Sequence, residues 1–61
     1  MALKKFKDIY DTDVSVNPDH VAEVRPEPND PDETTIIRLR DGKELGIKGK
    51  YQDVVDELNH P

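Results

Sequence analysis

The most regular pattern of apolar and polar residues lies in residues 34–48, on either side of Asp41-Gly42. Apolar and polar side chains alternate there with a period of two, which is typical of a β-strand with one buried face. Asp-Gly between two such runs is a common hairpin turn. The sequence therefore predicts a β-hairpin over residues 34–48.

Side-chain register decides the length of the loop in this hairpin. A two-residue loop would place Leu39 opposite Glu44, whereas a three-residue loop over 40–42 places Leu39 opposite Lys43. The longer loop gathers four apolar side chains on one face, and a slip of one residue would turn every side chain to the other face. We therefore expect a type I turn with a bulge and Gly42 in the left-handed region. The four apolar residues are Ile37, Leu39, Leu45 and Ile47.

The N-terminal half of the chain predicts another hairpin, over residues 4–16, with its turn at residues 11–13. Asn17 and Pro18 follow, and they suit the cap and the first position of a single helical turn. A further strand over residues 20–25 contains valines at 21 and 24, which cannot share one face of a regular strand. Either a bulge or a later start of the strand would resolve this conflict.

Two segments complete the chain. Residues 26–33 contain three prolines and four acids, which favours an exposed loop. Residues 51–59 carry apolar side chains at i, i+3, i+4 and i+7, which predicts a short amphipathic helix that must dock on a sheet. The expected fold is α+β: a small antiparallel sheet of three to four strands, built from two hairpins and packed by one C-terminal helix. The apolar stripe consists of Tyr51, Val54, Val55 and Leu58.

Composition limits what such a fold can do. The chain has 61 residues, of which 33% are hydrophobic, and a formal net charge of −5. We expect a single domain over residues 1–61 with a thin core, and a second copy of the chain is one way of supplying more burial. We expect no enzymatic activity, because no catalytic motif is found and so few apolar residues hardly form both a core and a cleft.

The chain contains no cysteine, which excludes disulfides and thiolate metal sites. The two histidines have no ligand partner at a suitable spacing, so we expect no metal and no cofactor. The sequence has no apolar run long enough to span a membrane and no leader-like N-terminus. A cytoplasmic protein without membrane contact is therefore expected.

Charge patterning points to two candidate interaction surfaces. Residues 34–50 contain five cations and two acids, and three lysines near the N-terminus could extend a basic surface. The loop 26–33 is instead acidic. The candidate basic contacts are Arg38, Arg40, Lys48 and Lys50, and the candidate acidic contacts are Asp30, Asp32 and Glu33.

Three runs together resemble the FlbD-like family of very small bacterial proteins linked to flagella and swarming motility, with relatives among phage proteins. The runs are residues 16–21 (VNPDHV), residues 35–45 with Asp41-Gly42, and residues 51–58 with Val54-Val55. The resemblance covers about residues 6–58 and implies a short strand, a turn at Asn17-Pro18, a hairpin and a closing helix. It implies no catalytic residues. The chain departs from the family pattern in its longer loop at 26–33 and in Gly49-Lys50 at the helix start.

The order of the turn, the hairpin and the helix also looks like the C-terminal part of LytTR DNA-binding domains. Three functional hypotheses follow. The first is a non-catalytic FlbD-like protein that binds a protein partner, or itself, through sheet edges and the helix. The second is a nucleic-acid-binding module that uses the four cations as phosphate contacts. The third is a phage-encoded inhibitor of a host protein, in which the acidic loop mimics an anionic ligand.

Overall fold

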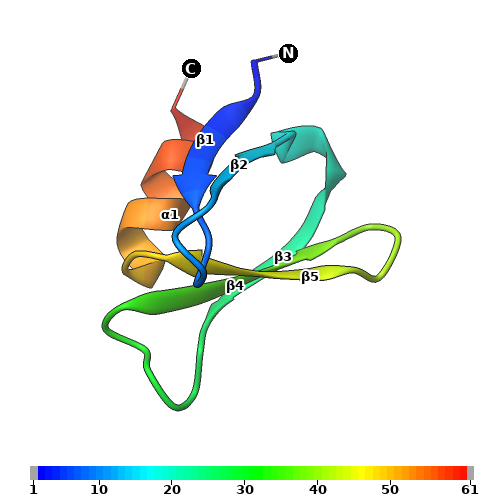
Figure 1. Cartoon of the computed structure of the whole chain (residues 1–61). Helices are drawn as coiled ribbons and strands as arrows, with labels where there is room; N and C mark the ends of the chain where they lie inside the picture. The colour runs from blue at the N-terminus through cyan, green and yellow to red at the C-terminus, as the bar shows by residue number, and fades with distance from the viewer. Residues whose placement is uncertain (1, 61) are drawn as a thin grey trace.

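The computed structural model describes residues 2–60, so Met1 and Pro61 of the expected domain lie outside the described residues. The fold is α+β, and residues 2–60 form five antiparallel strands, one 3-10 turn and one C-terminal helix (Figure 1). The strands form a two-stranded sheet, β1-β2, and a three-stranded sheet in the order β3-β4-β5. In chain order the elements are β1 (Lys4–Lys7), β2 (Asp13–Val16), η1 (Pro18–His20), β3 (Val21–Pro26), β4 (Thr34–Leu39), β5 (Glu44–Lys48) and α1 (Tyr51–Asn59).

The hairpin of β4 and β5 has the register that the apolar face predicts. Ile37 lies opposite Leu45, Thr35 opposite Ile47 and Arg38 opposite Glu44. The Leu39 amide donates to the Lys43 carbonyl at 2.8 Å, so the loop is three residues long. Gly42 has a φ of 94°, as the expected turn requires. The hairpin over residues 34–48 is thus confirmed.

The turn at Asn17 and Pro18 is also confirmed. Pro18–His20 form one 3-10 turn, and the Asn17 side-chain oxygen accepts a hydrogen bond from the Asp19 amide at 3.0 Å. In the strand that follows, the register shifts between Val21 and Glu23, so a bulge resolves the conflict between the two valines.

The first hairpin differs in detail from the prediction. Lys4 pairs with Val16 and Lys7 with Asp13, but β1 ends at Lys7 instead of residue 10. The turn begins earlier than residues 11–13, because Asp8 Oδ1 accepts hydrogen bonds from the backbone amides of Tyr10 and Thr12, each at 2.9 Å. The sequence predicts one sheet of three to four strands; within residues 2–60 the structure has five strands, because the first hairpin forms a two-stranded sheet of its own beside the three-stranded one.

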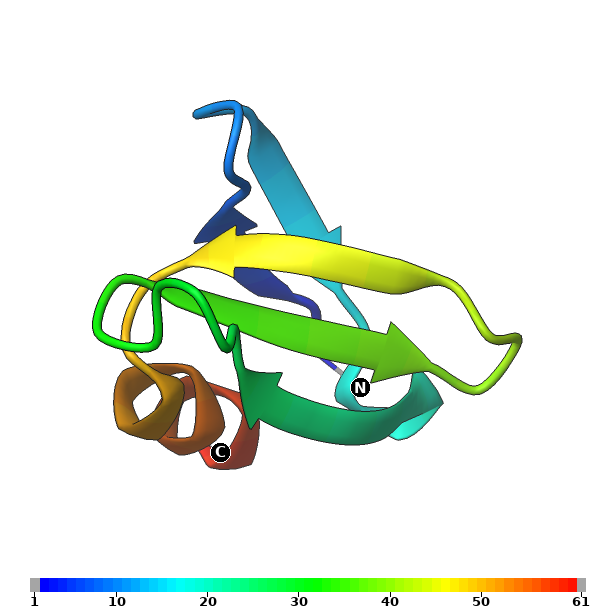
Figure 2. The same ribbon diagram turned by 90° about the horizontal axis from the view of Figure 1, so that it is seen from below.

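The core lies between two layers. One layer is the three-stranded sheet; the other consists of the first hairpin and the helix, which both cover the same face of that sheet (Figures 1 and 2). Among the described residues, the buried apolar side chains are Val16 (3% exposed), Ile37 (0%), Ile47 (0%) and Val54 (2%). Leu39, Leu45 and Leu58 are partly buried around them. Four different elements therefore each supply one residue to the core.

The helix spans residues 51–59 as expected, but its apolar stripe is narrower. Val54 is buried, Val55 and Leu58 are half-buried, and Tyr51 is 40% exposed. Tyr51 is the first residue of the helix and does not join the core. Lys50 caps the helix without a side-chain hydrogen bond to the backbone.

Replacing Gly42 with valine should destabilise the fold by about 1–2 kcal/mol, because a β-branched residue rarely adopts positive φ. A Cβ at this position would meet no atom within 4 Å, so backbone conformation alone accounts for the loss. Chemical denaturation measures it. Gly42→Asn is the control and should lose clearly less, since asparagine tolerates this region; equal losses for both variants would contradict the explanation.

Candidate interaction surfaces

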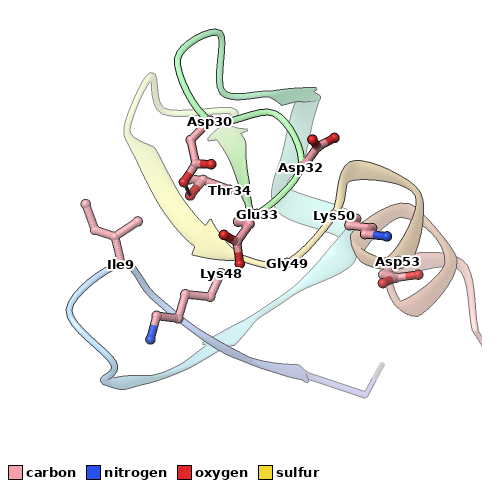
Figure 3. A pocket seen from close by; sticks show the side chains of 9 residues that line it. All are labelled: Ile9, Asp30, Asp32, Glu33, Thr34, Lys48, Gly49, Lys50 and Asp53. Carbon is pink, nitrogen blue, oxygen red and sulfur yellow. Dashed lines mark hydrogen bonds between the residues drawn. The ribbon is translucent and has the colours of Figure 1, made fainter.

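The four predicted basic contacts do not form one surface. Arg38 lies near the end of β4 on the face away from the core, whereas Arg40 lies in the turn that follows the strand. Lys48 and Lys50 lie at the opposite end, on either side of Gly49, and their side chains point in different directions (Figure 3). The expected basic face is therefore divided into separate positions.

Acidic neighbours partly neutralise these cations. The Arg38 guanidinium lies 3.0 Å from a Glu23 carboxylate oxygen, and Lys48 Nζ lies 3.3 Å from Asp11 Oδ1. Among residues 2–60, no ion pair of this kind involves Arg40 or Lys50. Because Arg38 and Lys48 are paired, the local excess of positive charge is smaller than the sequence indicates.

The N-terminal lysines do not extend a basic surface as a group. Lys4 is buried at 9% exposure, while Lys7 Nζ lies 2.9 Å from Asp13 Oδ1. The hydrogen bond to Asp13 and its charge raise the pKa of Lys7 above the ordinary value of 10.5. Because the folded pKa is raised, this pair contributes to stability below pH 10.5 and ceases to do so as the pH rises through the folded pKa.

The acidic loop starts after Pro26, which is the last residue of β3, and is tied down by backbone hydrogen bonds. The Asp30 amide donates to the Glu27 carbonyl at 3.1 Å, and the Thr34 hydroxyl donates to Asp30 Oδ2 at 3.1 Å. The Gly49 amide donates to the Glu33 carbonyl at 2.7 Å. The predicted exposed loop is therefore present, and its conformation is fixed at both ends.

An open depression of about 700 Å³ lies between this loop, the end of β5 and the start of α1 (Figure 3). It brings together five of the predicted contacts: Asp30, Asp32, Glu33, Lys48 and Lys50. The acids do not converge on one point, because Asp30 turns toward Thr34 while the side chains of Asp32 and Glu33 point in opposite directions (Figure 3). No group of side chains suited to a metal ion occurs among the described residues.

Thr35 joins the sheet to the start of the helix below this depression. It is fully buried on β4, and its hydroxyl donates to the Gly49 carbonyl at 2.8 Å. Sequence alternation places Thr35 on the apolar face, and a buried polar side chain there indicates a hydrogen bond to the backbone. The contact fixes where β5 ends and the helix begins.

The face of the three-stranded sheet away from the core carries alternating charges. Glu23 and Arg25 on β3, Arg38 on β4 and Glu44 on β5 form two ion pairs, Arg38–Glu23 at 3.0 Å and Arg25–Glu44 at 3.5 Å. Ile36 lies among them, on the exposed face as the register predicts. Arg38 lies opposite Glu44 in the β4–β5 register, while its guanidinium forms its ion pair with Glu23 on the other neighbouring strand.

Ile9 folds over the edge of β5 onto this charged face. Its amide donates to the Gly46 carbonyl at 3.1 Å, and a Cβ on Gly46 would lie 3.1 Å from the Ile9 side chain. Gly46 therefore makes room for Ile9. The Asp8–Ile47 bridge continues this contact, so the first hairpin occupies part of the β5 edge.

The opposite edge of the sheet, along β3, has no strand partner within the described part of the chain. A shallow groove of about 190 Å³ lies between this edge and the helix. It is lined by Pro18, Val21, Val24, Val55, Leu58 and Asn59. The sequence-based reasoning did not single out this surface, although Pro26 gives a signal for it, since proline in a sheet is confined to edges, strand ends and bulges.

Comparison with family models, curated proteins and solved structures finds no match for this chain. No helix among residues 2–60 is long and apolar enough to cross a membrane.

Replacing Thr35 with valine should cost about 1–2 kcal/mol of unfolding free energy, because the Gly49 carbonyl loses its donor. Thermal or chemical denaturation measures the loss. Thr34→Val is the matched control, since the Thr34 hydroxyl bonds Asp30 in an exposed position, and it should cost less. The interpretation fails if the two variants are equally stable.

Proposed function

We propose that this chain is a small, non-catalytic, FlbD-like interaction protein of bacterial or phage origin. It works in the cytoplasm and binds a protein partner through the open edge of β3 and the adjoining helix. The observation that carries the proposal is the combination of an unpaired strand edge with a half-buried apolar groove beside it. Such an edge presents backbone donors and acceptors that a second strand can use.

The groove supplies the apolar part of this contact. Val21 and Val24 on β3, and Val55 and Leu58 on the helix, are each only partly buried. A partner strand beside β3 would cover these side chains and complete the core on that side. In a protein with so few fully buried residues, the surface covered by a partner is a large share of all the apolar surface that is buried.

The resemblance to FlbD-like proteins fits this arrangement. The VNPDHV run contains the capped 3-10 turn that leads into β3, and the run ending in Leu45 forms the hairpin that carries β3 on its other side. The third run forms the helix that lines the groove. The three runs thus surround the proposed binding edge, which supports a shared mode of interaction.

A photo-crosslinking residue placed at Ala22 tests this function in the cells that produce the protein. Ala22 is exposed on the free edge, so we expect a protein adduct that an excess of the unmodified chain competes away. Lys43 is the control position, because it is exposed and directly precedes β5, the strand that does not pair with β3. Equal adducts at both positions, or none at Ala22, would contradict binding through this edge.

The fixed conformation of residues 27–33 favours a second candidate function, the inhibition of a host protein by an anionic mimic. The loop presents exposed carboxylates on a backbone held by hydrogen bonds, which lowers the ordering cost of binding. The acids concerned are Asp30, Asp32 and Glu33.

This second candidate is tested with the crosslinking residue at Asn29, in the loop itself. We expect an adduct that disappears when Asp30 and Asp32 become asparagine and Glu33 becomes glutamine. The melting temperature of the triple variant is the control, since asparagine keeps the acceptor for Thr34. An adduct that survives removal of the charges would argue against mimicry.

A further inference from the structure

We propose that the partner of the β3 edge is β3 of a second copy of this chain, paired antiparallel about a two-fold axis at Val24. This inference rests on the proposed function and names the partner of that surface. It is carried by the backbone directions along β3, by the order of charges on its exposed face and by the apolar groove beside it.

Backbone directions follow from the ladder with β4. The Glu27 amide donates to the Thr34 carbonyl at 3.0 Å, which makes Glu27 and Thr34 a hydrogen-bonded pair. Because such pairs alternate along an antiparallel ladder, Arg25 and Glu23 turn their backbone groups toward β4. The N–H and C=O of Val24 therefore point out from the free edge, where a second strand can receive both.

Charge selects the register of the second strand. With the two-fold axis at Val24, Glu23 lies opposite Arg25 of the second copy, and Arg25 opposite Glu23, on the exposed face. Moving the axis by one residue in either direction places Glu23 opposite Glu23 or Arg25 opposite Arg25. Like charges directly opposite are destabilising, so one register is favoured over its two neighbours.

The ion pairs within each copy and the charge pairs across the contact together form one row of alternating charges. Glu23 lies between Arg38 of its own sheet and Arg25 of the second copy. Arg25 in turn has Glu44 on its own side at 3.5 Å. The contact therefore joins two three-stranded sheets into one six-stranded sheet whose outer face alternates in charge.

The inner face supplies apolar contact. Val24 pairs with the buried Ile37 and faces the core side of the sheet. Across the two-fold axis it meets Val24 of the second copy, and the grooves lined by Val55 and Leu58 come to lie next to each other. Burial is thus gained where the single chain leaves its core incomplete.

Pro26 and the bulge at Val21–Glu23 keep the pairing short. Proline has no N–H to donate, and the register shift interrupts the other end of the strand. Both features restrict pairing to the segment centred on Val24. Because Ile9 bonds Gly46 at the other edge of the sheet, the contact closes as a dimer and does not extend into a fibre.

Two charge variants and their mixture test this proposal. Glu23→Arg alone places arginine opposite Arg25, and Arg25→Glu alone places glutamate opposite Glu23, so each variant should dimerise about tenfold more weakly or worse. Mixed together, the variants place opposite charges at every position. We expect monomers of about 7.0 kDa from each alone and a one-to-one heterodimer from the mixture, measured by native mass spectrometry and light scattering.

The mixture distinguishes an effect on the interface from an effect on folding. Mixing restores opposite charges only between the two chains, whereas the ion pairs lost within each chain stay lost. Lys43→Glu is the matched control: it reverses a charge in the exposed turn and should leave the dimer intact. Should either variant fail to fold, hydrogen exchange of the Val24 amide in the unchanged protein gives an independent answer. Protection of that amide should rise with protein concentration.

Three outcomes can be distinguished. A dimer of the unchanged chain with heterodimers in the mixture supports self-association through β3. A monomer at all concentrations whose Ala22 position still crosslinks a different protein overturns self-association and leaves the proposed function in place. A monomer without an edge-specific adduct overturns both.

Discussion

Everything in this fold depends on which face of the β4–β5 hairpin is buried. Ile37 and Ile47 are fully buried on that face, and each buried side chain of this kind contributes about 1.5–3 kcal/mol. The loop of three residues with Gly42 at positive φ sets the register that brings both inward. With a register shifted by one residue on one strand, that strand would present charge to the helix and the first hairpin, and neither could dock.

The covering layer follows from that constraint. Val16 from the first hairpin and Val54 from the helix meet the same sheet face, so the two parts of the covering layer contribute one buried apolar residue each. Thr35 fixes the end of β5 through Gly49 and thereby places the first turn of the helix. On the other face, only Ile9 covers part of the sheet, over Gly46, among the described residues, and the rest of that face carries two ion pairs. The edge of β3 is free for a different reason: it is the end strand in the order β3-β4-β5, and no described strand pairs with its outer side.

The sequence predicted the elements well wherever side chains alternate or a turn has a specific chemical signature. The hairpin register, the Asn17-Pro18 turn, the bulge and the helix bounds all follow from such local rules. The sequence-based prediction was wrong where contacts between residues far apart in the sequence determine which side chains are buried or paired. Tyr51 fits the helical stripe but stays exposed at the first residue of the helix, and Lys4 is buried because it lies opposite Val16, which belongs to the core. The basic surface was overestimated for the same reason, since Glu23 and Asp11 approach Arg38 and Lys48 only in the folded chain.

The same reasoning explains why β3, and not β2, is suited to a partner. Both strands have one free side within the described residues, but β2 is four residues long and begins at the exposed Asp13, two features that discourage pairing. The edge of β3 is longer and lies beside apolar side chains of the helix. Glu23 and Arg25 on this strand have opposite charges and lie two positions apart. A two-fold axis between two antiparallel copies of the strand therefore places each of them opposite its counter-charge. A chain of this size gains stability by covering one such edge, and Pro26 limits how far the pairing runs.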